Sequence, residues 1–153
     1  NALNDSNVVV WHQSGKGRDD QVKAVYADKG VPAKVTEFID DMAMAYAWAD
    51  LLLCRAGAMT IAECCAAAKP ALLVPYPFSA GDHQEFNAHT LVTVGAAEVF
   101  DNSQIESPEF QASLAKLVGD KATLKLMGQQ SYSLHKPNAL TDVTQVCQEF
   151  LNV

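Results

Sequence analysis

Short apolar segments of about four residues recur along the chain, and stretches with helical character separate them. The expected strands are residues 8–11, 35–38, 51–54, 71–74 and 97–100. Continuous apolar runs of this length are typical of parallel strands that are covered on both faces. Right-handed crossovers join such strands through helices. The sequence therefore predicts a Rossmann-like α/β domain, in which a parallel sheet has helices on both faces.

The stretches between the strands have the caps and the spacing of helices. Asp40 or Asp41 can cap a helix in which Met42, Tyr46 and Ala49 share one face. The other expected helices are residues 19–29, 58–68, 83–94, 107–118, 121–134 and 139–151. The last of them carries an apolar stripe along one side.

Length and composition fit one soluble globular domain, with 153 residues of which 49% are hydrophobic and 19% charged. The net charge of −7 argues against nucleic acid and against a polybasic membrane anchor. We therefore expect local groups to hold any anionic ligand. Because the chain begins at Asn1 without a methionine or a targeting segment, we expect a fragment or a processed product.

The cysteines predict neither a zinc site nor a disulfide framework. They are Cys54, Cys64, Cys65 and Cys147. No two have the Cys-x-x-Cys spacing, and three lie in apolar surroundings, as expected of reduced thiols in a cytosolic protein.

The strongest functional indication is residues 51–63, where an apolar strand passes through small residues into a helix. The first N–H groups of a helix have no helical partner, and the helix dipole adds positive charge there, so phosphates bind such ends. Gly57 leaves the backbone open to an anion. Glu63, expected in the first helical turn, offers acceptor oxygens for ribose hydroxyls. The segment predicts a site for a nucleotide diphosphate and its ribose.

A structural alternative exists for the same segment. Thr60 and Glu63 are spaced as a capping box, in which two side chains satisfy the start of the helix. Ligand binding is favoured because the loops after Phe38, Cys54 and Val74 should face one crevice at the carboxyl edge of the sheet.

Four segments in order closely resemble the C-terminal half of the MurG glycosyltransferase family. They are His12-Gln13-Ser14-Gly15, residues 37–42, residues 55–63 and residues 82–88. The resemblance covers essentially the whole chain and implies the C-terminal domain of a GT-B glycosyltransferase. MurG enzymes transfer N-acetylglucosamine from UDP-N-acetylglucosamine to lipid I, making lipid II for peptidoglycan on the cytoplasmic face of the bacterial inner membrane. The resemblance implies that this half binds the donor, while an N-terminal half binds the lipid acceptor and touches the membrane.

The resemblance also implies roles for individual residues. The uracil would lie at the loop of Phe38 and Ile39, where the backbone of Ile39 reads the base edge. The positions that match the diphosphate site are Ala58, Met59, Thr60, Ile61 and Ala62. Glu63 matches the carboxylate that binds the ribose. Gln84 and Asn87 match residues that meet the sugar hydroxyls, which an amide can distinguish because it both donates and accepts.

Three of these neighbourhoods have plainer explanations. Gln84 and Asn87 also fit an exposed helix start behind an Asp82 N-cap, with Gln84 pointing into water. Arg55 fits either a surface cation that balances acidic neighbours or a phosphate partner. Ile39 would pass as a core residue.

The implied reaction is a metal-independent, inverting transfer in which an acceptor hydroxyl attacks the anomeric carbon and UDP leaves. N–H groups at the start of the 58–68 helix would stabilise charge as it builds on the diphosphate. The pairs Asp19-Asp20 and Asp40-Asp41 suit helix caps, and we expect no metal or cofactor. The general base, a glycine-rich loop and the first strand of the sheet are expected before Asn1, so the chain alone should be inactive. No histidine is assigned a catalytic role.

Two other function classes remain as alternatives. A separate, non-catalytic nucleotide-sugar-binding subunit that acts with a membrane-bound partner would have a similar sequence. The reading frame upstream of Asn1 would distinguish it from part of a transferase. A dinucleotide-dependent oxidoreductase is disfavoured because no Gly-x-Gly-x-x-Gly turn is present.

Overall fold

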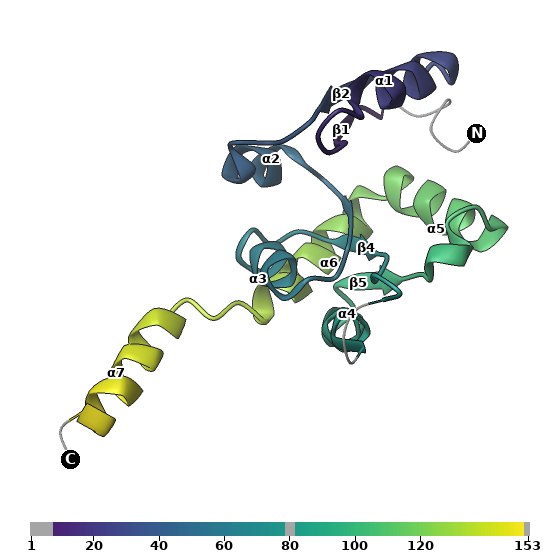
Figure 1. The fold of residues 1–153 in the computed structure, drawn as a ribbon. Coiled ribbons are helices and arrows are strands. Elements are labelled where there is room, and N and C mark those ends of the chain that lie inside the picture. The colour runs from purple at the N-terminus through teal and green to yellow at the C-terminus, as the bar shows by residue number, and fades with distance from the viewer. Residues whose placement is uncertain (1–7, 79–81, 152–153) are drawn as a thin grey trace.

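Five short strands alternate with helices in the computed structural model, which describes residues 8–78 and 82–151 (Figure 1). The strands are β1 (Val10–Gln13), β2 (Ala33–Thr36), β3 (Leu52–Cys54), β4 (Ala71–Leu73) and β5 (Ala97–Val99). The helices are α1 (Asp19–Asp28), α2 (Met42–Trp48), α3 (Ala58–Ala66), α4 (His83–Thr93), α5 (Pro108–Gly119), α6 (Lys121–Ser133) and α7 (Ala139–Leu151), with a 3-10 turn, η2, at Asn102–Gln104.

All strand pairs are parallel, which confirms the predicted α/β class. The strands form two sheets: β1 pairs with β2, and β4 lies between β3 and β5. Within the described residues, β1, β2, β3 and β5 each have one edge that pairs with no strand. Figure 1 shows the β1, β2 and α1 unit apart from the three-stranded sheet.

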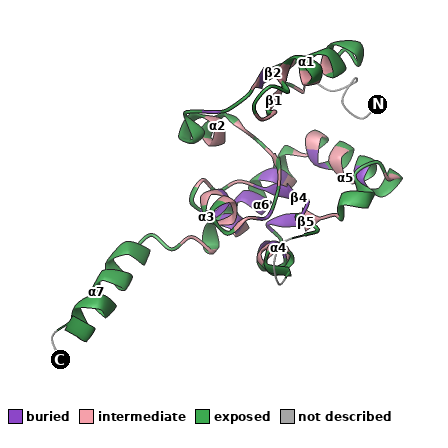
Figure 2. Cartoon of the chain, in the orientation of Figure 1, coloured by how far each residue is buried: buried purple, intermediate pink, exposed green. Residues whose placement is uncertain are grey.

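Helices cover both faces of the larger sheet, as predicted. Side chains of β4 alternate between the faces, because successive residues of a strand point in opposite directions. Ala71 and Leu73 face a core shared with α3 and α4. Leu72 faces a second core formed by side chains of α5 and α6. The buried residues of both cores gather around β4 and β5 (Figure 2).

The two N-terminal strands are shifted from their predicted positions. The first begins at Val10 instead of residue 8, and the second ends at Thr36 instead of residue 38. Phe38 therefore lies in the following loop and is exposed. The third strand was predicted to be buried on both faces, but Leu53 is 56% exposed because β3 is an edge strand.

Helix caps follow the sequence in part. Asp41 caps α2, accepting a hydrogen bond from the N–H of Met44 at 2.8 Å, as predicted. The prediction that Asp19 and Asp20 are caps is wrong. Arg18 is the N-cap of α1, and both aspartates lie in the first turn, where they pair with Lys23. Carboxylates in that turn still interact favourably with the helix dipole.

Helix α7 projects away from the two sheets (Figures 1 and 2). Its predicted apolar stripe is exposed in the structure: Val143, Val146, Cys147 and Phe150. No helix among the described residues combines the length and the apolar character that crossing a bilayer requires.

Candidate functional site

The N-terminus of α3 follows the carboxyl end of β3, where the sequence predicted an anion site. Gly57 is the N-cap, and no side chain caps the helix. The helical ladder begins with the N–H of Ile61, which donates to the Gly57 carbonyl at 2.9 Å. The N–H groups of Ala58, Met59 and Thr60 therefore precede the ladder. Because Ala58 and Met59 are exposed, solvent and ligands can reach this end of the helix.

The capping-box alternative for Thr60 and Glu63 is wrong. The extended backbone of an N-cap occurs at Gly57, so Thr60 is the third helical residue. For the same reason Glu63 lies in the second turn of α3, and its predicted place in the first turn is wrong as well. Its Oε2 accepts a hydrogen bond of 2.7 Å from the hydroxyl of Tyr46 on α2.

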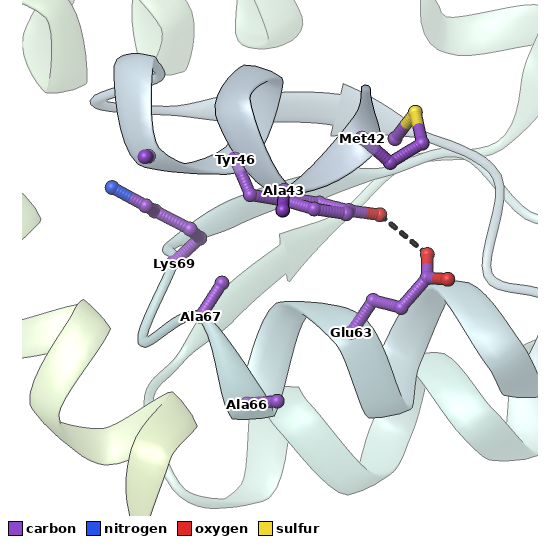
Figure 3. A pocket seen from close by; sticks show the side chains of 8 residues that line it. Met42, Ala43, Tyr46, Glu63, Ala66, Ala67 and Lys69 are labelled. Carbon is purple, nitrogen blue, oxygen red and sulfur yellow. Dashed lines mark hydrogen bonds between the residues drawn. The ribbon is translucent and has the colours of Figure 1, made fainter. Parts of the chain in front are cut away.

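An open groove of about 530 Å³ lies between α2 and α3, and Figure 3 shows Tyr46 and Glu63 facing each other across it. Lys69 also lines the groove, but its ammonium donates to the carbonyl of Ala49 at 2.8 Å. Burial and the hydrogen bond to Glu63 both raise the pKa of Tyr46. The Tyr46 hydroxyl therefore stays protonated at neutral pH and donates its hydrogen bond to Glu63.

Ile39 is buried, and its N–H donates to Oε1 of Gln13 at 3.0 Å. The turns after β1 and β2 are joined by further bonds: Ser14 donates its N–H to the Thr36 carbonyl, and Gly15 donates to that of Glu37. A base that reads the Ile39 N–H must replace the Gln13 oxygen there. No local pattern in the sequence indicates this internal partner, because Gln13 lies 26 positions away from Ile39.

The two amides of α4 both bind the backbone of neighbouring loops. Asn87 donates through Nδ2 to the Ala56 carbonyl at 3.1 Å, and Gln84 accepts through Oε1 from the N–H of Tyr76 at 2.9 Å. The alternative in which Gln84 points into water is therefore wrong. Asp82 is the N-cap of α4, but its φ is 54° and its side chain makes no capping bond. Part of the expected loop, residues 79–81, lies outside the described residues.

Arg55 ties the end of β4 to its surroundings. Its Nη1 donates to the carbonyls of Val74 and Pro75 at 3.1 and 3.0 Å, and Nη2 donates to Oδ1 of Asn102 at 3.0 Å. The guanidinium carbon lies 5.6 Å from the Tyr76 ring centroid. Arg55 thus stabilises the loop after β4 through hydrogen bonds to its backbone. Neither sequence alternative included this structural role.

The predicted site residues fall into two groups. Ile39 belongs to the turns after β1 and β2, whereas Gln84 and Asn87 belong with the start of α3 and the end of β4. Helix α2 links the groups: Tyr46 at one side bonds to Glu63 of α3, and Trp48 makes an edge-to-face contact with Trp11 of β1, with ring centroids 5.8 Å apart. In the described part of the chain no hydrogen bond joins Ile39 directly to either amide of α4.

The described cysteines are all free thiols. The hydrogen bond with Cys54 and burial raise the pKa of the Cys64 thiol, which belongs to the core beneath α3. Across residues 8–78 and 82–151, no three His, Cys, Asp or Glu side chains are grouped as a metal site requires. A hydrogen bond of 3.0 Å joins Nδ1 of His12 to the hydroxyl of Tyr26.

Comparison with known proteins decides the family. The sequence model of the glycosyltransferase family 28 C-terminal domain matches residues 1–144. The chain belongs to this family. The predicted resemblance to MurG, and with it the C-terminal domain of a GT-B enzyme as the fold, is therefore confirmed.

Individual members of family 28 are similar along nearly the whole chain. The UDP-N-acetylglucosamine–N-acetylmuramyl-(pentapeptide) pyrophosphoryl-undecaprenol N-acetylglucosamine transferase of Nitratidesulfovibrio vulgaris (strain DP4) is 43% identical over 98% of the chain. The transferase of the same name from Chromohalobacter salexigens is 44% identical over 92%. The chain spans 41% and 38% of these two relatives, respectively.

A solved structure agrees with the family assignment. The crystal structure of Acinetobacter baumannii MurG superposes with a TM-score of 0.87 at 35% sequence identity. The match covers 97% of this chain and 44% of the MurG chain. The backbone described above therefore matches a part of the longer MurG structure.

Proposed function

We propose that this family 28 domain binds UDP-N-acetylglucosamine as the donor half of an inverting glycosyltransferase that converts lipid I to lipid II in peptidoglycan synthesis. The observation that carries the proposal is the open N-terminus of α3, where three N–H groups precede the helical ladder. Anions bind such ends. The relatives that share 43–44% of this sequence are named as N-acetylglucosamine transferases with this donor.

The diphosphate is assigned to the first turn of α3 and the ribose to Glu63. The contacts at the diphosphate are Ala58, Met59, Thr60, Ile61 and Ala62. Glu63 lies five residues beyond Ala58, about 7.5 Å along the helix axis. This spacing allows one nucleotide to reach both groups. The uracil is assigned to the backbone of Ile39, and the sugar hydroxyls to Gln84 and Asn87.

Charge on the leaving group is the chemical problem that this domain addresses. When UDP leaves, negative charge grows on the diphosphate. The N–H groups at the start of α3 stabilise this growing charge more strongly than they stabilise the intact donor in the ground state. The acceptor, lipid I, the membrane contact and the general base are assigned to the part of the protein outside this chain. The chain by itself is expected not to catalyse transfer. Its proposed location is the cytoplasmic face of the bacterial inner membrane.

The free edges of β1 and β3 support a further part of the proposal, that another strand of the same domain precedes this chain. A strand with open N–H and C=O groups pairs readily with another strand. A single inserted strand that pairs with both edges would join the two sheets into one. We assign the glycine-rich loop expected before Asn1 to the end of that strand.

Calorimetric titration of the complete protein that contains this chain tests the donor assignment. We expect saturable binding of UDP-N-acetylglucosamine, with UDP-N-acetylgalactosamine and an ADP-sugar bound more weakly. Equal binding of the ADP-sugar would contradict the assigned base site. Transfer to lipid I by a chain that carries both halves would separate the enzyme from a non-catalytic donor-binding subunit.

Replacing Glu63 by alanine should weaken UDP binding by about 2 kcal/mol, or roughly 30-fold, because hydrogen bonds to a charged group contribute about 1.5–3 kcal/mol. Titration with UDP measures the change. Glu106→Ala is a matched control, since Glu106 is an exposed carboxylate in the loop between η2 and α5. Unchanged affinity in Glu63→Ala, with a lower melting temperature, would assign Glu63 to the contact between α2 and α3 alone.

Replacing Gln84 by alanine should reduce the preference for UDP-N-acetylglucosamine over UDP-N-acetylgalactosamine about fivefold and leave UDP binding unchanged. Its Oε1 is engaged by Tyr76, so Nε2 is the group available to donate to a sugar hydroxyl. One neutral hydrogen bond contributes about 1 kcal/mol. Asn87→Ala is expected to weaken UDP as well, because Asn87 holds the loop before α3 through Ala56. Competitive titrations of both variants distinguish the two roles.

A further inference from the structure

Tyr46 donates its hydroxyl to one oxygen of Glu63 from a different helix, 17 positions earlier in the chain. The two side chains meet across the groove between α2 and α3 (Figure 3). Both are half-buried. The contact is 2.7 Å long, which is the usual length of a hydroxyl hydrogen bond to a carboxylate.

The partner of Glu63 is a neutral donor and not a cation. In the part of the chain that the structure describes, Glu63 forms no ion pair, and the neighbouring Lys69 is turned to the Ala49 carbonyl. A lysine or arginine would neutralise the carboxylate and compete for both of its oxygens. A tyrosine hydroxyl takes one oxygen and leaves the charge in place. Glu63 therefore keeps Oε1 as a charged acceptor.

A single bond at Oε2 also restricts the Glu63 side chain. A free glutamate has several rotamers and loses that freedom when it binds a ligand. A side chain already held in one orientation has less freedom to lose, and this preorganisation strengthens binding. Two hydroxyls on adjacent carbons of a ribose are a ligand that such an oriented acceptor can distinguish from a deoxyribose.

We propose that Tyr46 is a positioning residue that orients the Glu63 carboxylate toward the ribose hydroxyls, and so sets the preference of the site for a ribonucleotide. The proposal rests on the proposed function, because it assumes that Glu63 meets the ribose. It gives α2 a role in donor binding, in addition to the role proposed for the residues of α3.

The test compares UDP with 2′,3′-dideoxy-UDP, which lacks both ribose hydroxyls, in titrations of the complete protein. Tyr46→Phe removes only the hydroxyl. We expect it to lower the ratio of the two affinities about threefold to tenfold, the size of one hydrogen bond, with the affinity for dideoxy-UDP unchanged. Ser113→Ala is the matched control, since Ser113 donates its hydroxyl to Glu98 at 2.6 Å between α5 and β5. Its ratio should equal that of the unaltered protein.

Glu63→Ala separates the two levels of the proposal. If Glu63→Ala abolishes the preference for UDP while Tyr46→Phe keeps it in full, the positioning role of Tyr46 is overturned and the ribose site stands. If Glu63→Ala keeps the preference, the ribose assignment fails and the role of Tyr46 fails with it. A lower melting temperature of Tyr46→Phe with an unchanged ratio would likewise overturn the proposal, because the hydroxyl would then only join α2 to α3.

Discussion

Replacing Leu72 by alanine should lower the free energy of unfolding by about 3–4 kcal/mol, the largest effect we expect from any single truncation of a side chain in this domain. Leu72 is fully buried at the centre of β4. It packs against residues from both helices that cover this face: Phe110, Leu117, Leu124 and Met127. The truncation removes apolar contacts and leaves a cavity that these neighbours can fill only in part.

Denaturant unfolding measures this loss, and Leu53→Ala provides the control. Leu53 is the residue that pairs with Leu72 in the register of β3 and β4. It is 56% exposed, so its truncation should cost less than about 1 kcal/mol. Equal losses in the two variants would contradict the assignment of Leu72 to a packed core between the sheet and α5 with α6.

Replacing Gly128 by alanine should destabilise the protein by about 3 kcal/mol, the upper end of the range for overpacking. Gly128 lies in α6 where this helix crosses the end of α3, and an added Cβ would be 2.4 Å from the carbonyl oxygen of Ala68. The nearest atoms belong to the backbone of Ala68, so they cannot move aside as the end of a flexible side chain could. Ala68 has a φ of 54° and donates its N–H to the Cys65 carbonyl. The loop can therefore make room only by breaking the contact between α3 and α6.

The matched control for Gly128 is Gly119→Ala, at the last residue of α5. Nothing lies within 4 Å of an added Cβ at Gly119. Alanine favours a helix over glycine by up to about 1 kcal/mol, so this variant should be as stable as the original or slightly more stable. Thermal unfolding of both variants measures the difference. A Gly128→Ala variant as stable as Gly119→Ala would contradict the close approach of α6 to Ala68.

The packing of α6 affects the proposed binding site through α3. This helix carries the proposed diphosphate site at one end and contacts α6 near the other. Its start is held by Asn87 through Ala56, and the chain just beyond its end is held against Gly128. A helix fixed at both ends presents its first N–H groups in one direction. Preorganised donors of this kind stabilise charge without a reorganisation cost.

The sequence predicted the order and type of the elements well because the signals for them are local. Apolar runs placed the strands, and the bond from Asp41 to Met44 spans only three residues. The start of α3 was also recognisable from sequence, because Gly57 and the residues after it leave an uncapped helix end beside a strand. Errors of two residues at β1 and β2 arose because apolar residues lie just outside the paired segments: Val8 and Val9 before β1, and Phe38 after β2.

The candidate site was predictable only in its backbone groups. N–H groups at a helix start follow from the fold of the segment itself. The partners of Gln84, Arg55 and Glu63 did not follow, because they lie 8 to 47 positions away in sequence. Spacing suggested a capping box for Glu63, whereas the extended backbone at Gly57 moved the cap three residues earlier and left Glu63 free to meet Tyr46.

Hydrophobic patterning and helix caps, which act over a few residues, determined the α/β class, the parallel strands and the position of α3 from sequence alone. Leu53 and Leu72 look alike in sequence, yet only the order of the strands makes one an edge residue and the other the centre of a core. Tyr46 likewise belongs to the same apolar face of α2 as its neighbours until α3 brings a carboxylate to its hydroxyl. The tertiary structure decided these points because burial and long-range hydrogen bonds depend on which segments become neighbours in space.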